Sequence, residues 1–238
     1  MHKETVFLGE LTRKELGDAI GNGTVKAAIV PTGATEQHQD HLAMIHDTVS
    51  VTEISRRVAM RFYPHVLVTP TIAMSVSEHH MSRGGALTVR PEIHAEHVYD
   101  ICHSLKRLGV SRVMVVNGHG GNRPPVRCEV RNWWQIKSVI AIADEVFGDA
   151  EGFHATPSEV ALTYYGYPDD AARVKKNKLI PKRAPQGPIY DAEDYRRRFP
   201  DGRIGSDPGL ATEEIGERLL EAAVAELSAD YQAFLAAP

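Results

Sequence analysis

Four short segments carry most of the side chains in this sequence that could do chemistry. The first places Glu36 and His38 two residues apart and continues to Asp47. In an extended segment, side chains two residues apart point to the same side. Carboxylate and imidazole ligands together suit zinc, manganese or iron. The segment therefore predicts a metal site, and an ordinary polar surface loop is the alternative.

The second segment is NGHGGN, in which glycines surround His119. Glycines let the backbone approach a ligand closely and can open a helix N-terminus towards it. Gly120 and Gly121 are therefore candidate substrate contacts. A phosphate cradle and a plain tight turn are the alternatives, although the segment lacks the Gly-Lys-Ser/Thr end of a P-loop and the GxGxxG of a dinucleotide site.

The two remaining segments each offer a histidine. In HATPSE, Pro157 is typical of the first turn of a helix, so Glu159 is expected in that turn, five residues after His154. Glu159 could instead only complement the helix dipole. In the other segment His79 and His80 are adjacent, and neighbouring side chains cannot both face one point in regular structure. We therefore predict that His80 binds substrate at the wall of the pocket.

The elements that position these segments alternate between short apolar runs and helical patterns. Continuously apolar strands alternating with helices indicate a three-layer α/β/α fold with a mainly parallel sheet. Each of the four segments follows a predicted strand, so all four are expected at one edge of the sheet. The predicted strands span residues 25–30, 65–71, 112–117 and 138–143, and the predicted helices span 49–62, 91–108 and 122–134, with a last helix after Thr212.

Composition restricts the class of protein. A chain of 238 residues, 42% of them hydrophobic, suits one domain over 1–238, with a long loop or arm at about 169–207. A net charge of −4 argues against nucleic-acid binding. No apolar run is long enough to span a membrane, and two cysteines favour a reducing, cytoplasmic setting. Of the 12 histidines, His41 and His46 flank the first segment and are predicted to support its ligands from outside.

The sequence resembles the creatininase (creatinine amidohydrolase) family. The matching pieces occur in family order and are GATEQHQDHL with Asp47, the His80 segment ending GGALTV, NGHGGN, HATPSE and GRIGSDPGLAT. The resemblance implies a three-layer α/β/α fold, two divalent metal ions (zinc or manganese, with iron possible) and a homohexamer that acts on a small molecule.

The resemblance also implies roles for individual residues. It implies that the metal ligands are Glu36, His38, Asp47, His119 and Glu159, with Asp47 as the bridge. His154 matches the family histidine of proton transfer. In such a centre two cations lower the pKa of a bridging water, the hydroxide attacks a carbonyl, and the histidine protonates the leaving group.

Two departures from the family pattern concern the substrate. Creatinine-hydrolysing members carry a carboxylate where this chain has Gly121, and a family phenylalanine is replaced by Arg83. Arg83 could bind an anionic or polarised oxygen of a substrate, or form a structural ion pair. We therefore expect C–N hydrolysis of a cyclic amide or formamide rather than of creatinine. The alternatives are C–C hydrolysis of an inositol-derived diketone, deformylation of a phosphorylated pyrimidine, and a non-catalytic metal- or phosphate-binding module.

Overall fold

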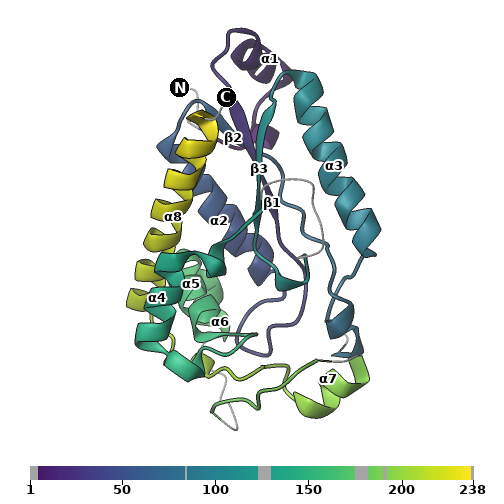
Figure 1. Ribbon diagram of the computed structural model, residues 1–238, viewed down its shortest axis with the longest axis vertical. Helices are drawn as coiled ribbons and strands as arrows, with labels where there is room; N and C mark the ends of the chain where they lie inside the picture. The colour runs from purple at the N-terminus through teal and green to yellow at the C-terminus, as the bar shows by residue number, and fades with distance from the viewer. Residues whose placement is uncertain (1–4, 84, 123–129, 175–181, 190–191, 237–238) are drawn as a thin grey trace.

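A parallel sheet lies at the centre of the computed structural model, which describes residues 5–83, 85–122, 130–174, 182–189 and 192–236 (Figure 1). Within these residues the sheet has four strands in the order β2-β1-β3-β4, and all three pairings are parallel. The strands are β1 (Ala27–Thr32), β2 (Val66–Val68), β3 (Arg112–Asn117) and β4 (Val130–Asn132).

Helices cover both faces of the sheet, so the fold has three layers. Successive side chains of a strand point to opposite faces. Ile29 accordingly packs into the core that contains α2 and α8, whereas Val30 packs into the core under α3. Figure 1 shows α8 and α3 on opposite sides of the sheet. The α/β fold class predicted from the sequence is confirmed. The helices are α1 (Arg13–Gly21), α2 (His46–Arg61), α3 (Pro91–Leu108), α4 (Lys137–Val146), α5 (Pro157–Gly166), α6 (Pro168–Val174), α7 (Ala192–Arg198) and α8 (Glu213–Ala236).

The strand order reverses next to β1. The chain runs from β1 through α2 to β2, and then returns through α3 to β3 on the other side of β1. In open α/β sheets, ligands bind beyond the carboxyl ends of the strands where the order reverses. The loops that follow β1 and β3 therefore meet where a site is expected.

The predicted fourth strand is wrong, because residues 138–143 lie inside α4. A short apolar run does not distinguish a buried strand from a buried helix. A distant residue favours the helix over the strand. Glu226 of α8 accepts hydrogen bonds from the backbone N–H groups of Lys137 and Ser138 at 3.2 and 3.1 Å. These N–H groups belong to the first turn of the helix, where intrahelical partners are missing. Only the tertiary structure supplies this cap.

The predicted helix at 122–134 is also wrong where the structure describes it. Asn122 ends a short 3-10 turn, residues 123–129 lie outside the described residues, and β4 follows at Val130–Asn132. β4 completes the parallel sheet beside β3. The strand that was expected at 138–143 is thus formed by an earlier stretch of the chain.

The last helix runs along one side of the sheet, whereas the described helix of the predicted arm lies at one end of it (Figure 1). Thr212 accepts a hydrogen bond from the backbone N–H of Ile215 at 3.3 Å and so caps α8, as predicted. Figure 1 shows α7 at the lower end of the molecule, beyond the carboxyl ends of the strands. There α7 packs against the 3-10 turn Glu78–Arg83, and its Tyr195 and Phe199 form a small core with Ile204.

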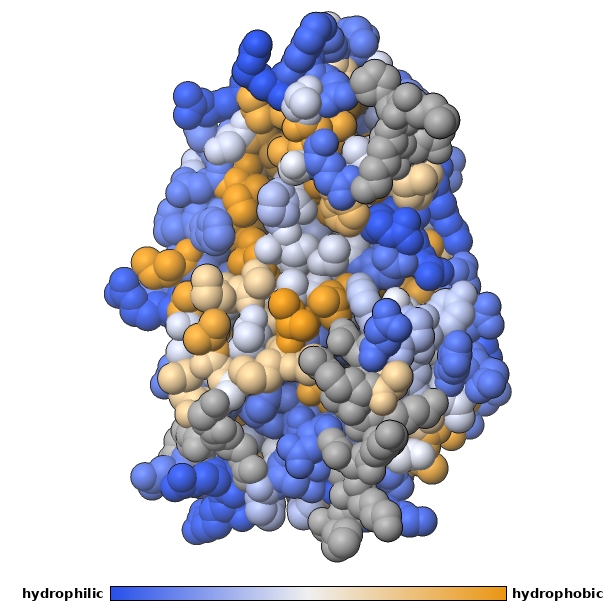
Figure 2. Space-filling view, turned by 180° about the vertical axis from the view of Figure 1, so that it is seen from behind, coloured by the Kyte–Doolittle hydropathy of each residue, from blue (hydrophilic) through white to orange (hydrophobic). Residues whose placement is uncertain are grey.

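The described surface mixes hydrophobic and hydrophilic residues. Seen from behind, hydrophobic residues gather in the middle of the face and hydrophilic residues surround them (Figure 2). Exposed large apolar side chains include Met74, Leu87 and Tyr99. Among the described helices, none is long and apolar enough to cross a membrane.

Candidate metal centre and active site

Asp47 lies between the loops that follow β1 and β3. It belongs to the first turn of α2, where a carboxylate is favoured by the helix dipole. Gly118, next to His119, lets the β3 loop lie against this turn. A Cβ at Gly118 would stand 2.6 Å from the Asp47 carbonyl oxygen and 2.8 Å from Val51 Cβ. The glycine thus permits the approach that brings His119 to Asp47.

The two carboxylate oxygens of Asp47 face two different histidines. Oδ1 lies 3.0 Å from His38 Nε2, and Oδ2 lies 3.0 Å from His119 Nδ1. A carboxylate placed in this way between two imidazoles has the geometry of a bridge.

A further carboxylate completes each side of this bridge. Glu36 Oε1 lies 3.2 Å from His119 Nδ1, and Glu159 Oε1 lies 3.6 Å from His38 Nε2. Four groups of potential ligand atoms result, each with members within 4.8 Å of one another, and Asp47 belongs to two of them. These two are Glu36, Asp47 and His119, and His38, His46, Asp47 and Glu159. The other two groups join Glu36 with His38 and His154, and with His79 and His80.

Hydrogen bonds outside the cluster orient both imidazoles. His119 Nε2 donates to the Val76 carbonyl at 3.0 Å, and His38 Nδ1 donates to the Glu36 carbonyl at 3.3 Å. In each ring the other nitrogen faces the carboxylates. Partners of this kind fix the tautomer of a metal-binding histidine.

Glu159 is held by the helix that carries it. Thr156 accepts from the Glu159 backbone N–H at 3.2 Å, and Glu159 Oε2 accepts from the Thr156 backbone N–H at 2.7 Å. This capping box occupies one carboxylate oxygen and leaves Oε1 facing His38. The predicted start of a helix at Pro157 is confirmed.

Charges within the cluster shift the pKa values of His38, His119 and Glu159 more strongly than burial does. Burial alone would lower the pKa of His119, but Glu36 and Asp47 raise it to about 10, and Asp47 likewise holds the pKa of His38 well above its ordinary value. Burial would raise the pKa of Glu159, yet the hydrogen bond from His38 lowers it to about 2. Protons on two imidazoles therefore offset two of the three carboxylate charges when no cation is bound.

Buried atoms without partners test whether this donor set fits metal ions. Among the described residues, Glu36 Oε2 and His46 Nε2 are buried and have no hydrogen-bond partner. Buried polar atoms are nearly always paired, so such atoms call for an ion or a water. The mixture of carboxylate oxygens and imidazole nitrogens matches the ligands of zinc and manganese. The residues present fit divalent metal ions.

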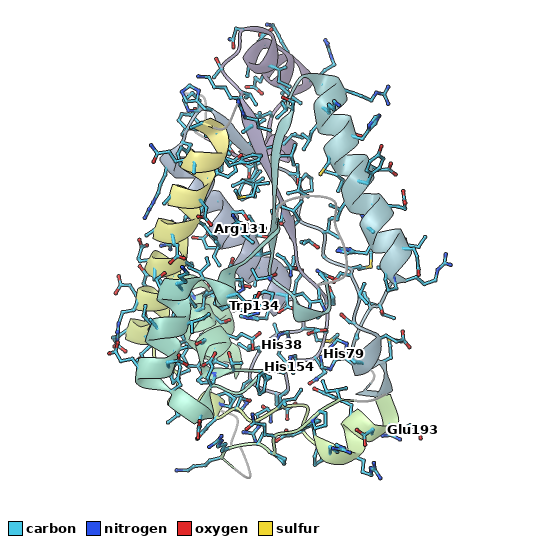
Figure 3. The ribbon with its side chains drawn as sticks, viewed as in Figure 1. His38, His79, Arg131, Trp134, His154 and Glu193 are labelled. Atoms are coloured by element: carbon cyan, nitrogen blue, oxygen red, sulfur yellow. The ribbon has the colours of Figure 1, made fainter. Side chains whose placement is uncertain are left out.

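His154 lies beside this cluster. Its Nε2 donates to the Gln37 carbonyl at 3.0 Å, and its ring centroid is 4.8 Å from that of His38. Figure 3 shows His154 next to His38 beyond the lower ends of the strands. Burial and then the nearby His38 lower the pKa of His154, so the ring is neutral at pH 7.

The expectation that His154 follows a strand is wrong, because α4 and a 3-10 turn precede it. A pairing with the 202–207 segment holds it instead. Phe153 N–H donates to the Ile204 carbonyl at 2.8 Å, and the Ser206 hydroxyl donates to the His154 carbonyl at 2.8 Å. The GRIGSD motif therefore holds His154 in the site through backbone and side-chain hydrogen bonds.

His79 and His80 both reach the pocket, which differs from the prediction of a role for His80 alone. They lie in a 3-10 turn, and a ring nitrogen of each is within 4.8 Å of a Glu36 carboxylate oxygen. His80 Nδ1 lies 2.9 Å from Gln37 Nε2, and Tyr195 of α7 packs edge-on against its ring. Arg83 ends the turn, and its side chain lies outside the part of the chain that the structure describes.

Gly120 and Gly121 both line the pocket but differ in the space around them. A Cβ at Gly120 would meet nothing within 4 Å, whereas a Cβ at Gly121 would lie 2.1 Å from the Val76 carbonyl oxygen and 2.5 Å from His119 Nε2. Gly121 therefore serves the placement of His119. The same clash means that the backbone here cannot carry a carboxylate at this position.

This contrast gives a matched pair of substitutions. We expect Gly121→Ala to displace the hydrogen bond between His119 and Val76, and so to weaken metal binding by about 10- to 100-fold. Gly120→Ala adds the same methyl group in open space and should keep the affinity within about twofold. Titration of both variants with zinc against a chelator measures the difference. Equal affinities would contradict the role given to Gly121.

The cluster opens into a cavity of about 580 Å³. Its lining includes four large apolar side chains, Trp134, Ile140, Phe153 and Ile189. Phe153 is 72% exposed, and Figure 3 places Trp134 near His38 and His154. No motif in the sequence singles out these four residues or Tyr195. The only available signal was that Phe153 adjoins His154 and that Trp134 belongs to a tryptophan pair.

Comparisons with known proteins agree with this architecture. A family model described as creatininase, creatinine amidohydrolase, matches residues 9–230. The chain belongs to the creatininase family. It is therefore a hydrolase of the amidohydrolase type, and the resemblance found in the sequence is confirmed.

Individual members of the creatininase family match over different lengths. The creatinine amidohydrolase of Pseudomonas putida is 27% identical over 253 residues, which cover 93% of this chain and 94% of that protein. A mycofactocin precursor peptide peptidase of Mycobacterium ulcerans (strain Agy99) is 32% identical over 140 residues, which cover 55% of this chain and about half, 54%, of that protein. The solved structure "Creatininase Mn" has a TM-score of 0.81 at 24% identity and covers 98% of this chain and 100% of that chain.

Proposed function

We propose that this creatininase-family chain hydrolyses a C–N bond of an amide or formamide at a centre of two divalent metal ions. The ligands would be Glu36, His38, Asp47, His119 and Glu159. The position of Asp47, with one carboxylate oxygen on each side of the cluster, is the observation that carries this proposal. Zinc and manganese are the preferred ions, and the donor set also admits iron.

The chain's own residues supply orientation and proton transfer. Bound divalent ions would polarise a carbonyl and provide a nucleophile at neutral pH. The Gln37 carbonyl holds the proton of His154 on Nε2 and leaves Nδ1 able to take up a proton. His154 can then pass a proton to the leaving nitrogen, which departs poorly as an anion.

A test of His154 separates catalysis from metal storage. We expect His154→Ala to retain its metal ions and to lose about 100- to 10,000-fold in kcat, because the proton donor is gone. Metal content is measured by elemental analysis, and turnover is measured with a substrate from the screen below. His65→Ala, at an exposed histidine near β2, is the control. Full activity of His154→Ala would disprove the proposed role, and loss of metal would make His154 a ligand.

The cavity favours a second candidate substrate. About 580 Å³ with several large apolar side chains is more room than a small cyclic amide fills. One relative is named a precursor peptide peptidase. A peptide-like amide with an apolar side chain is therefore the alternative C–N substrate.

A hydrolysis screen with metal-loaded protein distinguishes the candidates. It includes cyclic ureas, lactams, formamides, cyclic diketones and short peptides with aromatic residues. We expect turnover of a C–N substrate. Turnover of diketones alone would establish C–C hydrolysis, and a phosphorylated formamide as the preferred substrate would establish the deformylase. No turnover at all would leave only a metal- or phosphate-binding module.

A further inference from the structure

His46, at the start of α2, is buried beside the candidate metal centre. The residue is 2% exposed, and its ring meets that of His38 edge-on, with centroids 5.1 Å apart and an angle of 64°. Within the described chain, His46 Nε2 has no hydrogen-bond partner. Its ligand atom lies within 4.8 Å of those of His38, Asp47 and Glu159.

Thr163 of α5 decides which ring nitrogen carries the proton. Its hydroxyl oxygen lies 2.7 Å from His46 Nδ1 and 3.0 Å from the Glu159 carbonyl oxygen. The hydroxyl has one proton, and the carbonyl can only accept it. His46 Nδ1–H must then donate to the Thr163 oxygen, which leaves a lone pair on Nε2. A hydrogen bond to the outer nitrogen is the usual device that prepares a histidine for a metal.

We propose that His46 Nε2 is a fourth protein ligand of the metal ion held by His38, Asp47 and Glu159. This inference rests on the proposed function, because it assumes that the centre binds metal. The unpaired nitrogen alone does not carry the proposal, because the buried His94 Nδ1 is also unpaired. What distinguishes His46 is its place among the ligand atoms of His38, Asp47 and Glu159, since His94 belongs to none of the ligand groups. The β3 loop cannot supply the ligand instead, because Gly121 has no room for a side chain.

The assignment makes the two metal sites chemically different. One site would be held by two imidazoles and two carboxylates, which is the number of ligands that zinc prefers. The other has Glu36, Asp47 and His119, and three protein ligands leave a position open for substrate. The substrate carbonyl is therefore expected at the Glu36 side of Asp47, and the ion on the His46 side is expected to exchange more slowly.

Metal content of His46 variants tests the proposal. Protein is dialysed against limiting zinc and analysed for bound metal, and the affinity of each ion is measured by competition with a chelator. The wild type should bind two ions. His46→Ala should retain one of them, and should weaken the other by about 100-fold. His46→Gln, which keeps most of the volume, should give the same loss.

Two further variants keep the test decisive. Thr163→Val removes the hydrogen bond to Nδ1 but no ligand, and should weaken the same ion by about tenfold. His94→Gln changes another buried histidine, whose Nε2 lies 3.4 Å from the Thr32 hydroxyl oxygen and which belongs to none of the ligand groups, so both ions should remain. If His46→Ala fails to fold, the metal affinities of His46→Gln and Thr163→Val test whether His46 is a ligand.

The outcomes separate this inference from the proposed function. A wild-type protein that binds no zinc or manganese would overturn the proposed function and this inference with it. A wild type with two ions, together with His46 variants that keep both at unchanged affinity, would overturn this inference alone. Cobalt substitution gives an independent readout, because losing an imidazole ligand changes the visible absorption spectrum of the bound ion.

Discussion

Asp47→Ala is expected to abolish binding of both metal ions and to reduce turnover by at least about 1,000-fold. The reason is its position: its two carboxylate oxygens lie 3.0 Å from His38 Nε2 and 3.0 Å from His119 Nδ1. Removing a ligand that both ions share weakens the binding of both, whereas removing a ligand of one ion weakens the binding of that ion alone. Elemental analysis and a turnover assay measure both effects.

Two controls accompany Asp47→Ala. Asp40→Ala removes an exposed carboxylate of the same loop and should retain both ions. Glu159→Gln should lose one ion, because Glu159 faces only His38. Two ions bound to Asp47→Ala would show that Asp47 is not the bridge.

Metal removal is expected to make stability strongly dependent on pH above neutrality. Without cations, the protonated His38 and His119 offset part of the negative charge of Glu36, Asp47 and Glu159. The pKa of His119 is raised from 6.5 to about 10, so its contribution to stability is complete below pH 6.5 and disappears as the pH rises through 10. Metal-free protein should therefore lose Tm by on the order of 10 °C between pH 6.5 and 10.

The metal-loaded protein should not show this loss. Bound cations replace the protons and hold the imidazoles neutral, so binding releases protons and becomes tighter as the pH rises. Thermal unfolding of both forms from pH 6.5 to 10 measures the contrast, and calorimetry in buffers of different ionisation heat counts the protons released. Parallel Tm profiles of the two forms would refute this account of the charges.

Local patterns in the sequence predicted several elements correctly. The apolar run before NGHGGN is β3, and Pro91 and Gly109 mark the ends of α3, where Gly109 adopts the left-handed backbone that favours glycine. The order of these elements was enough to predict a parallel sheet with covered faces. Because the carboxyl ends of parallel strands meet at one edge, the β1 and β3 segments could also be expected together.

Elements that depend on distant partners were not predictable in this way. Residues 138–143 have the pattern of a buried strand, and they form a helix because Glu226 of α8 caps its first turn from 88 residues away along the chain. His154 was expected after a strand, yet it is held by hydrogen bonds with the 202–207 segment. No window of local sequence contains either partner.

Short-range pattern and composition were sufficient to predict three strands of the parallel sheet, the family and the residue types offered to metal ions, but not the fourth strand. Only the tertiary structure decided how those residues divide into two ligand groups around Asp47. It also placed a ring nitrogen of His46, expected as an outer support, among the potential ligands, and left His46 Nε2 unpaired. The physical reason is that a ligand group is defined within a few ångströms, and such distances are set by the packing of α2, α5 and the loops after β1 and β3.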